Sequence, residues 1–113
     1  ISVLFSDTEQ GVRAVATACS LAKDMKARLT VMLPAVSLEE MQVLREKAIA
    51  ILKLHEQVAR LVQITGSDAR SLVRATGASG ISILVTEAEH PLLQQAGLEQ
   101  CLEELFCPVL LVR

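Results

Sequence analysis

The chain has 113 residues, of which 51% are hydrophobic and 21% charged, and its net charge is −2. This length suits one domain, over residues 1–113, that buries a core without disulfides or metals. Lysine and arginine are scattered and only two residues are aromatic. Neither a nucleic-acid surface nor direct membrane contact is therefore expected. The high apolar fraction predicts that some apolar surface is hidden in a partner.

The three cysteines, Cys19, Cys101 and Cys107, form no C-x-x-C pair and have no zinc-ligand spacing. We interpret them as reduced thiols that pack as small apolar side chains in a cytoplasmic protein. No apolar segment approaches the ~20 residues that a membrane span needs, and no signal peptide is visible. Because Ile1 stands where an initiator methionine would be, we expect that the chain could be excised from a longer protein.

The first elements are a strand and a helix. Residues 1–6 form an apolar run typical of a buried strand. Asp7 and Thr8 then offer an N-cap for a helix over residues 9–26. The apolar side chains that recur there at helical spacing are Val12, Val15, Ala16, Cys19 and Ala22.

A second strand and helix follow. Residues 28–33 are predicted to form a strand that Pro34 closes. Ser37 and Glu40 have capping-box spacing, so a helix should begin there and run to about residue 55. The side chains that it should turn inward are Met41, Leu44, Ala48, Ile51 and Leu52.

The second half of the chain continues the alternation. Residues 57–65 indicate a strand near a sheet edge, residues 68–76 a short helix, and residues 81–86 a central strand. A final helix should carry Leu98, Cys101, Leu102 and Leu105. Pro108 then opens an aliphatic strand, because proline is tolerated at a strand's first position.

This alternation predicts an α/β fold with a five-stranded, doubly wound parallel sheet and helices on both faces. The strand order that we expect for it is 3-2-1-4-5. In such sheets ligands bind beyond the carboxyl ends of the strands, at the switch point where the strand order reverses. Here the switch point falls between the first and fourth strands. The residues expected to line it are Ser6, Asp7, Thr8, Thr86, Glu87 and Ala88.

Several segments resemble those of universal stress protein domains, in the same order over nearly the whole chain. Asp7-Thr8 after the first strand, the segment Ala27 to Val31 and the closing Cys107-Pro108 followed by aliphatic residues are similar to the family's pattern. The resemblance implies an adenine nucleotide alpha hydrolase-like fold and a homodimer formed through the last strand. It also implies that such a domain can be appended to a transporter or a sensor kinase.

The chain departs from the family at the nucleotide loop. Nucleotide-binding members carry Gly-x-x-Gly and then Gly-Ser or Gly-Thr after the fourth strand, where backbone N–H groups close on phosphates. The segment from Thr86 to Leu93 has no glycine, and Gln95-Ala96 aligns with the family's Gly-Ser. Glu87 and Glu89 would repel a phosphate. We therefore expect that triphosphate binding has been lost and that no cofactor is bound.

Other chemistries find little support in the residues. Asp7 could contact adenine, but we interpret it as a helix cap because it precedes a helix and Gln10 lies three positions on. A phosphoacceptor receiver would need an acidic pair and a lysine that are missing. His55 is interpreted as structural and His90 as a turn residue. A metal site would need a third well-placed ligand, which the sequence does not supply. No catalytic set is predicted.

The function expected from the sequence is a non-enzymatic regulatory or dimerisation module that does not bind ATP. One alternative is a stress protein that binds adenine nucleotide with a degenerate loop, using Asp7, Thr8 and Thr86 at the switch point. Another is a cytoplasmic regulatory domain of a larger protein. The dimer interface is expected on the last strand, an aliphatic edge without charge or proline, at Val109, Leu110, Leu111 and Val112.

Overall fold

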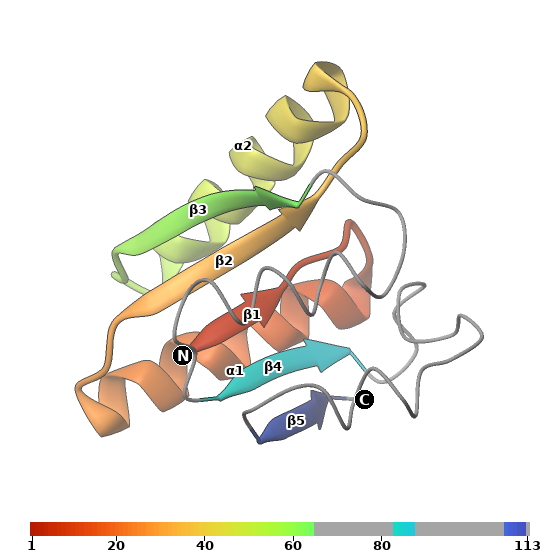
Figure 1. Cartoon of the computed structure of the whole chain (residues 1–113). Helices are drawn as coiled ribbons and strands as arrows, with labels where there is room; N and C mark the ends of the chain where they lie inside the picture. The colour runs from red at the N-terminus through yellow and green to blue at the C-terminus, as the bar shows by residue number, and fades with distance from the viewer. Residues whose placement is uncertain (65–82, 88–107, 113) are drawn as a thin grey trace.

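The computed structural model describes residues 1–64, 83–87 and 108–112. They form one parallel five-stranded sheet with the order β3-β2-β1-β4-β5, which confirms the predicted order 3-2-1-4-5 (Figure 1). The elements are β1 (Ser2–Leu4), α1 (Glu9–Met25), β2 (Leu29–Pro34), α2 (Leu38–Leu54), β3 (Ala59–Ile64), β4 (Leu84–Glu87) and β5 (Val109–Val112).

β1 is the central strand of the sheet. It pairs with β2 on one side and with β4 on the other, so that Leu4 lies between Met32 and Thr86. β3 and β5 are the two edges, as predicted for the third strand. The last pair between β4 and β5 joins Glu87 to Val112.

α1 lies against the sheet through a face of mostly small residues. The buried members of this face are Gly11, Ala14, Val15, Ala18, Cys19 and Ala22. The expected inward position of Val12 is wrong, because its side chain is 42% exposed. Alanine and glycine are small, so the helix axis can lie close to the strands. Because Ala14 and Ala18 face the sheet, Val12 faces solvent. The helix ends at Lys26, whose φ of 51° is left-handed.

α2 agrees closely with the expected helix. Ser37 is its N-cap, and the side chain accepts a hydrogen bond from the Glu40 N–H at 3.2 Å. The Glu40 carboxylate accepts from the Val36 N–H and not from the N-cap itself, so the capping box is displaced by one residue. The buried side chains are Leu44, Ala48 and Leu52, and Met41 and Ile51 pack partly buried against them.

α1 and α2 lie on the same face of the sheet and enclose the core with it (Figure 1). Val3, Val31 and Val85 contribute to this core from the three central strands. Leu4 and Met32, at alternate positions that face the other side, are also almost fully buried. The strands are therefore apolar on both faces, as parallel strands generally are.

Some expectations lie outside the described residues. These are the helix over residues 68–76, the final helix with Cys101, the strand residues 81 and 82, and Cys107. In the part of the chain that the structure describes, no helix is both long enough and apolar enough to cross a membrane.

Candidate functional site

The switch point between β1 and β4 brings together side chains from two distant segments. Ser6 and Thr8 lie in the turn between β1 and α1, and Glu87 is the last residue of β4. The sequence placed Glu87 in the loop after the fourth strand. The structure places it on the strand, because β4 extends one residue further than expected.

Glu87 is a buried carboxylate with two hydroxyl partners. Its side chain is 4% exposed. Ser6 Oγ donates to Oε1, and Thr8 Oγ1 donates to Oε2 at 3.1 Å. The two hydroxyl oxygens lie 2.9 Å apart. Both carboxylate oxygens are thus hydrogen-bonded, which a buried carboxylate requires. We call Ser6, Thr8 and Glu87 the Glu87 clasp.

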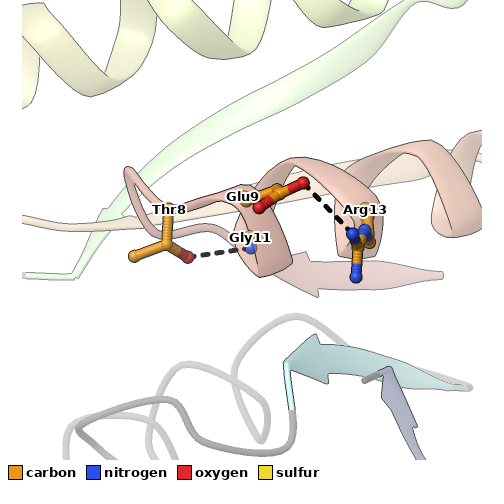
Figure 2. Close-up of polar contacts among 4 residues, drawn as sticks. All are labelled: Thr8, Glu9, Gly11 and Arg13. Atoms are coloured by element: carbon orange, nitrogen blue, oxygen red, sulfur yellow. Dashed lines mark hydrogen bonds and ion pairs between the residues drawn. The ribbon is translucent and has the colours of Figure 1, made fainter.

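Thr8 has a second role as the N-cap of α1. Its side chain accepts from the Gly11 N–H at 2.9 Å, as Figure 2 shows together with the neighbouring Glu9–Arg13 ion pair. The Glu87 carboxylate therefore lies beside the N-terminus of a 17-residue helix. The helix dipole favours negative charge at that end. The dipole and the two hydroxyls together stabilise Glu87 at this position.

Gly11 is required by close approach to Ser6. A Cβ at position 11 would lie 2.5 Å from Ser6 Oγ and 2.9 Å from the Ser6 carbonyl carbon, and it would overlap the carbonyl oxygen. Most of these atoms are backbone atoms that have little room to move. The absence of a side chain at Gly11 therefore sets the position from which Ser6 reaches Glu87.

Asp7 lies outside the clasp, and its prediction as the helix cap is wrong. Thr8 is the cap. The Asp7 carboxylate instead forms an ion pair with Lys47 of α2 at 2.5 Å, and both side chains are about half exposed. Asp7 and Thr8 are both good capping residues, and the backbone conformation at Thr8, extended with φ −135° and ψ 164°, decides between them.

Thr86 and His55 are the remaining candidate residues that the structure describes. Thr86 is fully buried, and its hydroxyl donates to the Glu87 carbonyl oxygen at 3.3 Å. Ala88, Glu89 and His90 lie outside the described residues. His55, the C-cap of α2, is partly exposed, and its backbone N–H bonds the Ile51 carbonyl. Its structural role stays a prediction.

Nucleophilic and metal chemistry find no support in the described residues. Cys19 is buried, and desolvation raises the pKa of its thiol, which lowers the reactive thiolate fraction. Within residues 1–64, 83–87 and 108–112, no three His, Cys, Asp or Glu side chains lie together as a metal site would need.

The comparisons with known proteins identify the fold. No protein-family model and no curated protein sequence matches the chain. A solved universal stress protein in complex with cAMP is similar over 99% of this chain and 96% of its own, with a TM-score of 0.74 and 15% identity. The universal stress protein from Archaeoglobus fulgidus in complex with dAMP has a TM-score of 0.74 and 11% identity, over 99% of this chain and 96% of its own.

A protein of the universal stress protein family from Burkholderia pseudomallei is similar at a TM-score of 0.66 and 22% identity, over 97% of this chain and 93% of its own. The chain therefore has the universal stress protein fold, as the sequence resemblance implied. At these identities the likeness extends to the fold alone.

Proposed function

We propose that this chain is a non-enzymatic regulatory or dimerisation module with the universal stress protein fold, and that it does not bind ATP. The observation that carries the proposal is the position of Glu87. Its buried carboxylate lies at the switch point and accepts hydrogen bonds from Ser6 and Thr8. The side chain thus uses the hydroxyl donors at the carboxyl ends of β1 and β4, where ligands bind in such sheets.

The electrostatic argument concerns phosphate. Two like unit charges ~4 Å apart repel by about 4 kcal/mol at an effective dielectric constant near 20. Each 1.4 kcal/mol is about a factor of ten in affinity. A phosphate beside Glu87 would need compensating donors. The sequence from Thr86 to Leu93 offers no glycine to supply a backbone cradle.

A second candidate function is the binding of an adenine nucleotide through a degenerate site. It is favoured by two of the similar structures, which hold cAMP and dAMP. These ligands carry one phosphate and less charge than ATP. Isothermal titration calorimetry with ATP plus magnesium, AMP and cAMP separates the two functions. The proposal expects no saturable heat with any of them, and stoichiometric binding of one would establish the second function.

The partner that we propose is a second copy of the chain, bound through β5. Leu110 and Leu111 are 41% and 53% exposed on this edge strand. An aliphatic edge with unpaired backbone groups invites another strand. A symmetric antiparallel pair would bury it in a closed contact.

The opposite edge is better protected. β3 carries the exposed Arg60 and Gln63, and charged or polar side chains discourage edge pairing. The Gln63 side-chain amide donates to the Ala35 carbonyl at 3.1 Å. This contrast supports β5 as the interface. It also agrees with the family resemblance, since such domains commonly dimerise through the last strand.

The cellular setting belongs to the same proposal. We place the module in the cytoplasm, either alone or attached to a larger protein such as a transporter or sensor kinase. No nucleic-acid or membrane contact is proposed, because the sequence shows no concentration of basic residues. The full-length open reading frame distinguishes the free module from the attached one.

A further inference from the structure

Glu87 belongs both to the switch point and to the strand pair that carries the β5 edge. Its side chain accepts hydrogen bonds from the turn that precedes α1. Its backbone lies opposite Val112, the last residue of β5, in the parallel register. One residue thus connects the β1–α1 turn to the end of the edge strand.

The position of β5 depends on β4. Among the described strands β5 pairs only with β4, and the pairing begins where the Leu84 N–H donates to the Pro108 carbonyl at 2.9 Å. Both strands have four residues and both contact α1. Val112 also packs against the core. With so few pairs, a shift of the carboxyl end of β4 would be transmitted to Val112 and its neighbours.

The clasp holds that end of β4 together with the pairing of Thr86 with Leu4 of β1. The two hydroxyls that hold Glu87 come from a turn that is itself held by the Thr8 cap and by the contact of Gly11 with Ser6. If the clasp opens, the buried carboxylate loses both partners and must move toward water, because leaving it unpaired is costly. The backbone of Glu87 would move with it, away from its place opposite Val112.

We infer that the Glu87 clasp positions the β5 edge, and that dimerisation is therefore coupled to the state of the switch point. The inference rests on the proposed homodimer. A closed clasp presents Leu110 and Leu111 in the geometry that the second copy needs, and an open clasp lowers the affinity of the two copies. Coupling between two equilibria is reciprocal, so dimerisation also stabilises the closed clasp.

The test measures the dimer dissociation constant by sedimentation equilibrium at a temperature where every variant is folded. Glu87→Ala and Ser6→Ala are each expected to raise the constant about tenfold. If the two effects were independent, the dissociation constant of the double variant would rise about a hundredfold. It should rise by much less, because both substitutions open the same clasp. Glu87→Gln keeps one acceptor oxygen and should give a smaller increase. Ser6→Ala leaves no empty core volume. If Glu87→Ala does not fold, the dimer dissociation constant of Ser6→Ala therefore tests the inference.

Leu52→Ala is the matched control for lost stability. Leu52 is buried in α2, which packs against α1, β2 and β3 on the β3 side of the sheet. It should lower the free energy of unfolding and leave the dimer constant unchanged. An unchanged constant in the clasp variants, or an equal rise in Leu52→Ala, would overturn the inference and leave the proposed dimer intact. A monomeric wild-type chain would contradict the dimer itself and the coupling with it.

Discussion

Thr8 and Glu87 are joined by a 3.1 Å hydrogen bond across 79 positions of sequence, and Thr8 caps α1 with the same oxygen. The Thr8 hydroxyl donates its proton to the carboxylate while its lone pair accepts from the Gly11 N–H. The local stability of the helix start and the burial of the switch-point carboxylate therefore depend on one side chain.

Replacing Thr8 by valine should be unusually destabilising for a substitution at an exposed residue. It removes the cap and leaves one oxygen of buried Glu87 without its donor, which together should cost about 2 to 3 kcal/mol. Thr8→Ser keeps the hydroxyl and should recover most of the loss. Urea unfolding measures the free energy of unfolding of both variants, provided that their m-values equal that of the wild type. A loss below about 0.5 kcal/mol would contradict the double role that we assign to Thr8.

Asp7→Ala should have a small effect. Its ion pair with Lys47 is about half exposed, and such pairs contribute roughly 0 to 1 kcal/mol. The same unfolding experiment, compared with Thr8→Val, shows which of the two neighbours is the cap. A loss at Asp7 as large as that at Thr8 would place the cap at Asp7.

Gly11→Ala should destabilise the protein although alanine is the better helix former by about 1 kcal/mol. The added methyl group would overlap Ser6, and overpacking typically costs about 1 to 3 kcal/mol. Ser20→Ala, at an exposed position of the same helix, is the control and should be neutral or slightly stabilising. The midpoints of thermal unfolding compare the two. A Gly11→Ala variant more stable than wild type would show that Ser6 can move without cost.

Cys19 should make stability fall at alkaline pH. Burial raises the pKa of its thiol in the folded chain, so the unfolded chain loses the proton first. The contribution is complete below the pKa of the unfolded thiol and is lost as the pH rises from there through the higher pKa of the folded chain. Free energies of unfolding at several pH values from 7 to 10 should decline more steeply for wild type than for Cys19→Ala. Parallel declines would show that Cys19 does not contribute.

The β5 edge should respond to charge. Replacing Leu110 and Leu111 together with lysine should give a monomer or insoluble protein, because the cations would be buried without partners in a strand pair. Glu39→Lys on the exposed start of α2 is the control and should do neither. Light scattering at ~50 μM is suitable, since an interface of micromolar affinity is mostly associated at that concentration. A monomeric wild-type chain would contradict the interface.

The parallel sheet could be predicted because it depends on features that a sequence carries strongly. The aliphatic runs at residues 1–6 and 109–112 are typical of strands buried on both faces, and the helical segments between strands require parallel pairing. The rule for switch points then placed Ser6, Thr8 and Glu87 at one edge of the sheet.

The bonding within the clasp could not be predicted. It depends on the register that pairs Leu4 with Thr86 and on the last residue of β4, and sequence patterns locate element ends only to within a few residues. The helical spacing of apolar residues predicts Val12 on the buried face of α1 and includes neither Ala14 nor Ala18. The close packing of the helix on the strands, which only small residues allow, decided otherwise.

Native mass spectrometry of freshly purified protein tests the central claim most directly, because one spectrum reports both the oligomeric state and any retained ligand. The claim is that this chain is a dimerising module whose switch point is closed by Glu87. The account predicts a dimer with the mass of two bare chains, unchanged after incubation with ~1 mM ATP and magnesium. A chain that carries one adenine nucleotide per copy, or one that stays monomeric, would contradict it.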